Sequence, residues 1–275
     1  MIPMFSIGPL TFYFFGIMIA IGSLVGIIIF NREAKRQGLD HKLLTDIAIY
    51  SIIGGIVGAR IVYILVYNPT YYFSNPIEIF SIHEGGLSIH GGILGGLLVG
   101  YWLLKRHKIS FWKTMDIVAP ALIIAQGISR IGCDVFGSPI SSSLPWGMAI
   151  NGEYLHPAQA YEFILDYLLF GYLWLRYNKP SYSGQVFIHY IIGFMIIRGI
   201  VEFTRINPMA FGPFSVSHVM SIIGIILGVV LIKYRKSKES EIKEIEFKKS
   251  EFLKLGLFVL GMIIVSVIIY YFVQG

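Results

Sequence analysis

One histidine stands out among the residues of this chain that could do chemistry. His90 lies in the stretch EGGLSIHGGILGG, from Glu84 to Gly96, with a pair of glycines on each side. Glycines let backbones approach closely and leave the ring unscreened, so Gly91 and Gly92 are candidates for contact with a substrate. Imidazole titrates near neutral pH, which suits a general base. A second interpretation stays open, in which the glycine pairs only break and pack helices and His90 is a satisfied polar residue.

Four arginines form the second group of such residues. The chain has 22 Lys and Arg residues, 18 of which lie in four hydrophilic linkers, and none of the four others is a lysine. These four are Arg60, Arg130, Arg198 and Arg205. A planar guanidinium binds phosphate or carboxylate through two parallel hydrogen bonds and keeps its charge in apolar surroundings. The pattern favours a pocket for an anion, and a phospholipid head group fits the charge.

Ion pairing within the protein is the alternative role for these arginines. Arg198 and Glu202 are four residues apart, and Glu202 and Arg205 three apart, so they share one face of a helix. Glu162 is another acidic residue available to the group. A charge within a membrane span costs several kcal/mol unless it is paired or faces a cavity. Because few acids accompany the arginines, we expect an anion pocket in addition to the pairs.

The composition predicts an integral membrane protein. Apolar residues make up 55% of the chain and charged residues 14%, and the mean hydropathy is +0.70. The net charge of +6 comes from basic linkers and therefore does not indicate nucleic-acid binding. Cys133 is the only cysteine, which excludes an intramolecular disulfide and a cysteine-based metal site. We expect neither a metal nor a cofactor, and we expect the first apolar segment to be a retained span.

Eight apolar runs are long enough, or nearly so, to cross a bilayer. They are Phe12–Phe30, Ile47–Tyr67, Leu87–Leu104, Met115–Ile131, Ala158–Leu175, Val186–Phe203, Val216–Ile232 and Leu253–Val273. Backbone polar groups in lipid must be satisfied within their own segment, so each run is expected to be a helix. The predicted fold is an all-α, polytopic bundle of transmembrane helices. The stretch Cys133–Met148, rich in Ser, Pro and Gly, is expected to be an exposed outer loop.

The basic residues also predict an orientation. All 18 linker lysines and arginines follow the first, third, fifth or seventh run, so these linkers are cytoplasmic by the positive-inside rule. Both termini then lie on the extracytoplasmic side of the membrane. Counting along the runs at about 1.5 Å per residue places the four arginines, Glu162 and His90 near that same side. We expect three regions: residues 1–232 as the main membrane domain, residues 233–251 as a charged cytoplasmic linker, and residues 252–275 as an additional span.

Four motifs in this order resemble those of the prolipoprotein diacylglyceryl transferases of the bacterial inner membrane. They are GARIVYILVYNPTYYFSNPIEIF with EGGLSIHGGILGG, SRIGC at Ser129–Cys133, HPAQAYE at His156–Glu162, and RGIVEFTR at Arg198–Arg205. The resemblance extends to the seventh run. It implies seven spans of the family type, with the eighth run as an addition.

The resemblance also implies a reaction. The diacylglyceryl group of phosphatidylglycerol would move to the lipobox cysteine thiol of a preprolipoprotein, releasing glycerol phosphate. His90 would be the base that forms the thiolate, and Arg130 and Arg198 would hold the phosphate and stabilise its developing charge. Glu202 and Arg205 would support them, and we add Arg60, Gly91, Gly92 and Glu162 as candidate substrate-binding residues. The implied partners are phosphatidylglycerol, the lipobox peptide and membrane lipid.

Three departures from the family pattern leave other functions open. Phe15 and Cys133 stand where the family usually has Tyr and Asn, and the Asn-Gly-Glu signature is displaced to Asn151–Glu153. One alternative is a divergent paralogue with a different acceptor or lipid donor. Another is a non-catalytic membrane protein that binds or transports lipid. His90 separates the second alternative from an enzyme, because binding alone needs no base.

Overall fold

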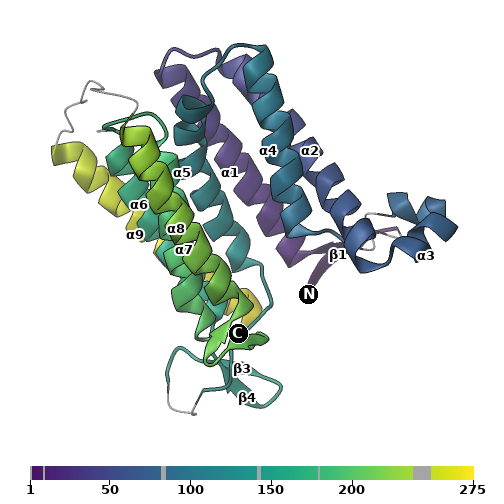
Figure 1. Cartoon of the computed structure of the whole chain (residues 1–275). Helices are drawn as coiled ribbons and strands as arrows, with labels where there is room; N and C mark the ends of the chain where they lie inside the picture. Colours follow the sequence, from purple (N-terminus) through teal and green to yellow (C-terminus); the bar gives the residue numbers. More distant parts are fainter. Residues whose placement is uncertain (1, 9, 82–84, 141–143, 179, 238–248) are drawn as a thin grey trace. The chain divides into compact units, whose positions relative to one another are not determined.

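The computed structural model describes residues 2–8, 10–81, 85–140, 144–178, 180–237 and 249–275 (Figure 1). Six helices in this part of the chain are long and apolar enough to cross a membrane. They are α1 (Phe14–Arg36), α2 (His41–Tyr67), α5 (Phe111–Ile131), α7 (Gln185–Glu202), α8 (Val216–Lys236) and α9 (Lys249–Gln274). The prediction of a helical, polytopic membrane protein is therefore confirmed.

Two further helices, α4 (Ile89–Arg106) and α6 (Ala158–Tyr177), occupy the remaining predicted runs. Both are long enough for a span but are not among the helices apolar enough to cross a membrane, so the number of spans stays a prediction. The helices also extend past the apolar runs. For example, α1 continues to Arg36, and α2 begins at His41 because the Asp40 side chain accepts a hydrogen bond from the backbone N–H of Leu43.

The chain forms two compact units. The first unit contains Met1–Phe30 and Met115–Gly275, and the second contains Asn31–Thr114. Each unit is a group of residues in contact with one another. This division does not test the predicted boundaries between membrane domain, linker and additional span at residues 232 and 251. Residues 238–248 of the predicted linker lie outside the described residues.

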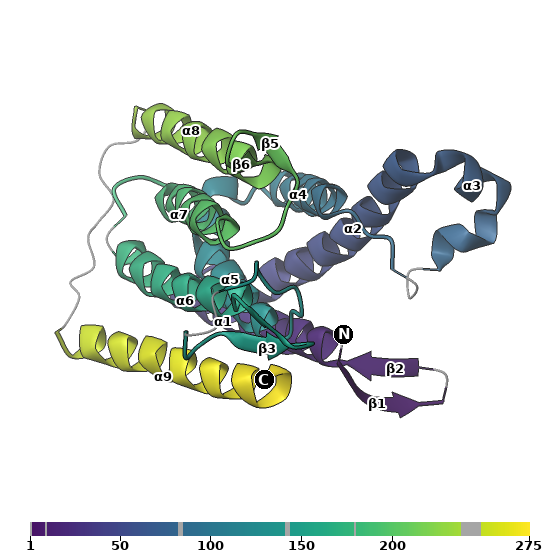
Figure 2. The same ribbon diagram turned by 90° about the horizontal axis from the view of Figure 1, so that it is seen from below.

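In the second unit, α2 and α4 lie side by side along a stripe of glycines (Figures 1 and 2). A Cβ atom on Gly58 or Gly91 would collide with the backbone of the opposite helix, whereas one on Gly92 would find ordinary van der Waals contacts at 3.7 Å. Gly54 and Gly58 of α2 thus allow the close packing of the two helices. After α2 the chain forms two short helices that we did not predict, α3 (Pro69–Ser74) and η1 (Pro76–Phe80).

The first unit places α8, α7, α6 and α9 in a row, as Figure 2 shows from one end, and α5 supplies much of the buried core. The described residues of this unit also form three two-stranded antiparallel hairpins. They are β1 (Pro3–Ile7) with β2 (Leu10–Tyr13), β3 (Met148–Ile150) with β4 (Glu153–Leu155), and β5 (Met209–Phe211) with β6 (Phe214–Ser215). The sequence did carry a signal for the β3–β4 hairpin, because Asn151-Gly152 is a dipeptide that favours a tight hairpin turn. Both residues have positive φ, 51° and 86°.

Candidate functional site

A short segment after α5 ties three helix ends of the first unit together. The backbone N–H of Gly137 donates to the carbonyl of His156 at 2.8 Å, and that of Ser138 to the carbonyl of Thr204 at 2.7 Å. The end of α5, the start of α6 and the end of α7 therefore meet at this segment. The prediction of an exposed loop is wrong for Cys133 and Gly137, which are buried, whereas Val135 between them is exposed.

Arg130 and Glu162 form an ion pair across two of these helices. Arg130 lies one residue before the end of α5, and its Nη2 atom is 2.8 Å from Oε1 of Glu162 in the second turn of α6. The Glu162 side chain is fully buried, while 31% of the Arg130 side chain is exposed. The Nη1 atom of Arg130 also lies 3.9 Å from Sγ of Cys133. One side of the guanidinium is thus held by the protein, and another remains open.

Arg198 and Glu202 form the second ion pair, on the last turns of α7. Nη2 of Arg198 is 2.8 Å from Oε2 of Glu202, which confirms that these residues pair at a spacing of four. The carboxylate also accepts hydrogen bonds from Nδ2 of Asn207 at 2.7 Å and from Oγ of Ser215 at 2.5 Å. Glu202 is therefore fixed from three directions, and it fixes the orientation of Arg198 in turn.

Sequence reasoning missed Ser215 and His218, which complete this arrangement at the start of α8. Nδ1 of His218 accepts the backbone N–H of Ser215 at 3.1 Å, and the Ser215 hydroxyl caps the helix. The His218 ring packs on Phe203, with 4.3 Å between ring centroids. The available signal was a helix start with Ser followed three residues later by a side chain that can reach back to it.

Arg205 lies just beyond α7 and adds a third positive charge. Burial lowers its pKa, the charges of Arg198 and Arg130 lower it further, and Glu162 opposes that shift. Nη1 of Arg205 and Nη1 of Arg198 are buried without a hydrogen-bond partner among the described residues. Buried donors of this kind are costly unless an acceptor satisfies them. The arrangement can therefore bind an anionic ligand.

The second unit contains the other candidate site residues, His90, Gly91, Gly92 and Arg60. His90 is exposed in the first turn of α4. Gly91 is buried against Gly58 of α2, so its free face is used for helix packing, while Gly92 is partly exposed. Because His90 belongs to one unit and Arg130 and Arg198 to the other, a common site for them stays a prediction.

Arg60 has partners of a different kind. Its guanidinium donates to four backbone carbonyls: those of Glu78 at 2.5 Å, Ile79 at 2.9 Å, Gly85 at 2.9 Å and Gly86 at 3.0 Å. The side chain also lies against the rings of Tyr63 and Tyr72. Arg60 thus holds the backbone of η1 and of Gly85 and Gly86, and so it supports the residues that precede His90.

Comparison with known proteins decides the family. Residues 3–234 match the family described as prolipoprotein diacylglyceryl transferase. The chain belongs to this family. The phosphatidylglycerol–prolipoprotein diacylglyceryl transferase of Clostridioides difficile strain 630 is 36% identical over 236 residues, covering 85% of this chain and 95% of its own. The protein of the same name from Staphylococcus haemolyticus strain JCSC1435 is 38% identical over 249 residues, covering 85% and 88%.

The match to the family includes both units but stops before α9. All the candidate residues described above lie within residues 3–234, whereas α9 begins at Lys249. The C. difficile relative has only 5% of its length outside the match, which is too short for a counterpart of α9 with its 26 residues. With respect to that relative, α9 is an addition of this chain.

Proposed function

We propose that this protein transfers the diacylglyceryl group of phosphatidylglycerol to the lipobox cysteine thiol of preprolipoproteins and releases glycerol phosphate. Family membership supports this reaction, and the relatives carry it in their names. Within the protein, one observation carries the proposal. A guanidinium nitrogen of Arg198 and one of Arg205 are buried and have no acceptor among the described residues. The phosphate of the donor lipid is an acceptor of suitable charge.

In this reaction Arg130 and Arg198 hold the phosphate. Each is oriented by a buried carboxylate, Glu162 or Glu202, while 31% of the Arg130 side chain and 21% of the Arg198 side chain stay exposed. As the bond between glycerol carbon and phosphate oxygen breaks, the electron pair stays on that oxygen. Oriented guanidinium groups stabilise the growing charge without reorganising, which lowers the barrier. Arg205 strengthens the positive potential around the phosphate.

His90 takes the proton of the substrate thiol. The resulting thiolate attacks the glycerol carbon, the new S–C bond replaces the C–O bond, and the proton can be passed on to the leaving phosphate. Exposure of His90 at the start of α4 makes the ring accessible to a peptide. Gly92 is a candidate for contact with the substrate, and Arg60 and Gly91 act through the packing of the segment that carries His90.

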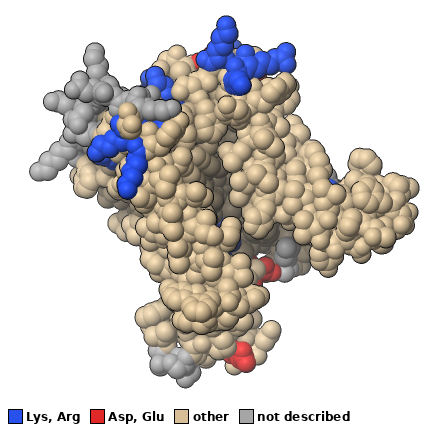
Figure 3. Space-filling model, in the orientation of Figure 1, with Lys and Arg blue, Asp and Glu red and all other residues tan. Residues whose placement is uncertain are grey.

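We also propose eight spans, with both termini and the His90 segment extracytoplasmic, residues 233–251 as a cytoplasmic linker and residues 252–275 as the added span. Seen by itself in Figure 3, the second unit carries most of its visible Lys and Arg where α2 begins and α4 ends. In the first unit, most visible basic side chains lie toward the end opposite the β3–β4 hairpin. In a Cys133→Ser background, an impermeant thiol reagent should label Ser74→Cys but not Ser110→Cys in intact cells. The reverse labelling would contradict the orientation.

The test of function is a mass measurement on a lipobox peptide incubated with the purified protein and phosphatidylglycerol. A gain of one diacylglyceryl group on the peptide is expected, and none on the same peptide with its cysteine changed to serine. Binding of phosphatidylglycerol without any transfer would support a lipid-binding protein instead. Consumption of phosphatidylglycerol without modification of this peptide would point to a different acceptor.

A further inference from the structure

The last turns of α9 are joined to the Arg130 region by buried hydrogen bonds. The Tyr270 hydroxyl donates to Oε1 of Gln159 at 3.1 Å, and Nε2 of Gln159 donates to the Cys133 carbonyl at 3.0 Å. Tyr270 and Gln159 are both fully buried. Because both ends of the Gln159 amide are satisfied, its orientation is fixed. These bonds run from Tyr270 through Gln159, three residues before Glu162, to Cys133, three residues after Arg130.

A second contact from α9 reaches the same turn. Nε2 of Gln274 donates to the carbonyl of Ile131, the last residue of α5. The last carbonyls of a helix have no partner within the helix and need one from elsewhere. At the end of α5, the carbonyls of Ile131 and Cys133 accept from α9 and α6. The residues on both sides of this turn are thereby held in place next to Arg130.

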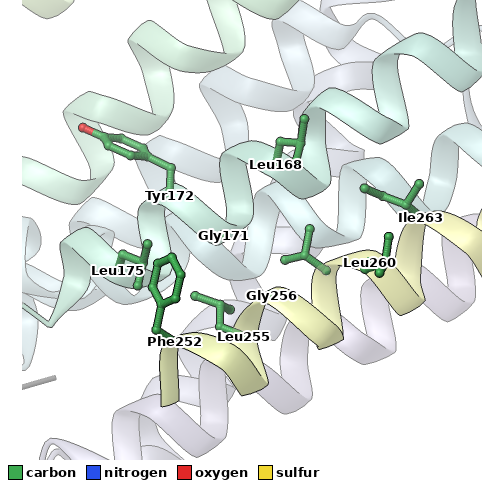
Figure 4. A pocket seen from close by; sticks show the side chains of 10 residues that line it. Leu168, Gly171, Tyr172, Leu175, Phe252, Leu255, Gly256, Leu260 and Ile263 are labelled. Atoms are coloured by element: carbon green, nitrogen blue, oxygen red, sulfur yellow. The ribbon is translucent and has the colours of Figure 1, made fainter. Parts of the chain in front are cut away.

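The opposite half of α9 packs less closely on α6. An apolar groove of about 290 Å³ lies there between the two helices, lined by residues such as Leu168 and Leu175 of α6 and Phe252 and Ile263 of α9 (Figure 4). The polar contacts of α9 are instead concentrated toward its C-terminal end. A helix that served only as a membrane anchor would not need buried hydrogen bonds at one end.

We propose that α9 is a positioning element for the ion pair of Arg130 and Glu162, with Tyr270 and Gln274 as its positioning residues. It holds the turn after α5 against the start of α6, so that Arg130 meets the donor phosphate in a fixed orientation. This inference rests on the proposed function. Since α9 lies outside the family match, we infer that this chain obtains part of its site geometry from a helix beyond the matched region.

The test compares two single hydroxyls on α9. Tyr270→Phe removes the hydrogen bond to Gln159, and the control Ser266→Ala removes the 3.0 Å bond to the Tyr167 hydroxyl, one turn away on the same interface. All four side chains are buried, so the two changes are matched in environment. We expect kcat to fall about tenfold or more in Tyr270→Phe with little change in KM, because a small misplacement of a catalytic group is costly. Ser266→Ala should stay within about twofold of the original protein. Gln274→Met, which removes the amide donor at similar length, should act like Tyr270→Phe.

A second readout does not depend on activity. Cys133 is the only cysteine and is buried beneath these contacts, so the rate of its labelling by a thiol reagent reports on the turn. Labelling should accelerate in Tyr270→Phe and Gln274→Met but not in Ser266→Ala. Equal kcat values and equal labelling rates in Tyr270→Phe and Ser266→Ala would overturn the inference. If the original protein had no transferase activity but these labelling rates still differed, the proposed function would fail while the positioning role would stand.

Discussion

Arg60 in the second unit and Arg198 in the first occupy similar places in the sequence pattern but have different partners. All four hydrogen bonds of Arg60 go to backbone carbonyls, and only 6% of the residue is exposed. Arg198 is paired with a carboxylate, keeps 21% of its side chain exposed and has a buried nitrogen without a partner among the described residues. Backbone carbonyls take four of the five N–H donors of Arg60, whereas the carboxylate orients Arg198 and leaves donors for a ligand. The same residue type therefore supports structure in one unit and suits chemistry in the other.

The largest expected effect tests whether the second unit contributes chemistry at all. His90→Ala should lower peptide modification by about a hundred to ten thousand fold, the usual cost of losing a general base. Binding of phosphatidylglycerol should persist, because the arginines of the first unit remain. Peptide modification can be measured with the mass assay, and phosphatidylglycerol binding with a labelled lipid. Loss of lipid binding along with activity would mean that His90 supports the lipid site and is not the base.

The next largest effect concerns the geometry of the arginines in the first unit. Arg198→Lys and Arg130→Lys keep the charge but lose the two-pronged hydrogen bonding, so turnover should fall by well over tenfold, more than about 1.4 kcal/mol of barrier. Thermal unfolding should change little, because both side chains are partly exposed and a charge remains. A lysine variant with near-normal turnover would show that these positions supply only charge.

Arg60→Lys should lower stability and leave activity largely unchanged, the opposite of the result expected for Arg130 and Arg198. A lysine cannot reach all four carbonyls, and buried acceptors that lose their partner cost about 1–3 kcal/mol of stability. The midpoint of thermal unfolding should therefore drop, while activity measured well below that midpoint stays within about threefold of the original protein. A large loss of activity without a loss of stability would place Arg60 in contact with substrate.

The smallest expected effect separates Gly92 from its neighbour. Gly91→Ala should destabilise the protein, because its Cβ atom would meet the backbone of α2. Gly92→Ala should leave stability within about 0.5 kcal/mol, since its Cβ would find ordinary contacts. If Gly92→Ala nevertheless reduced activity, the substrate would approach His90 over this glycine. Unchanged activity would remove Gly92 from the substrate-binding residues.

The sequence by itself determined the helices and the pairing within one helix. Long apolar runs in lipid can satisfy their backbones only as helices, so the structure has a helix at each of the eight runs. Arg198 and Glu202 pair because residues four apart lie on the same helical face, whatever the helix packs against. The family was visible for a similar reason, since its motifs are local in the chain.

The tertiary structure alone decided which residues meet between helices. In a membrane protein, residues that face lipid and residues that face another helix are equally apolar, so the pattern does not say which helices touch. The pairing of Arg130 with Glu162, the carbonyl partners of Arg60 and the bond from Tyr270 to Gln159 all depend on that packing. Each joins residues far apart in the chain, because side chains of neighbouring helices come within reach only after the helices have packed.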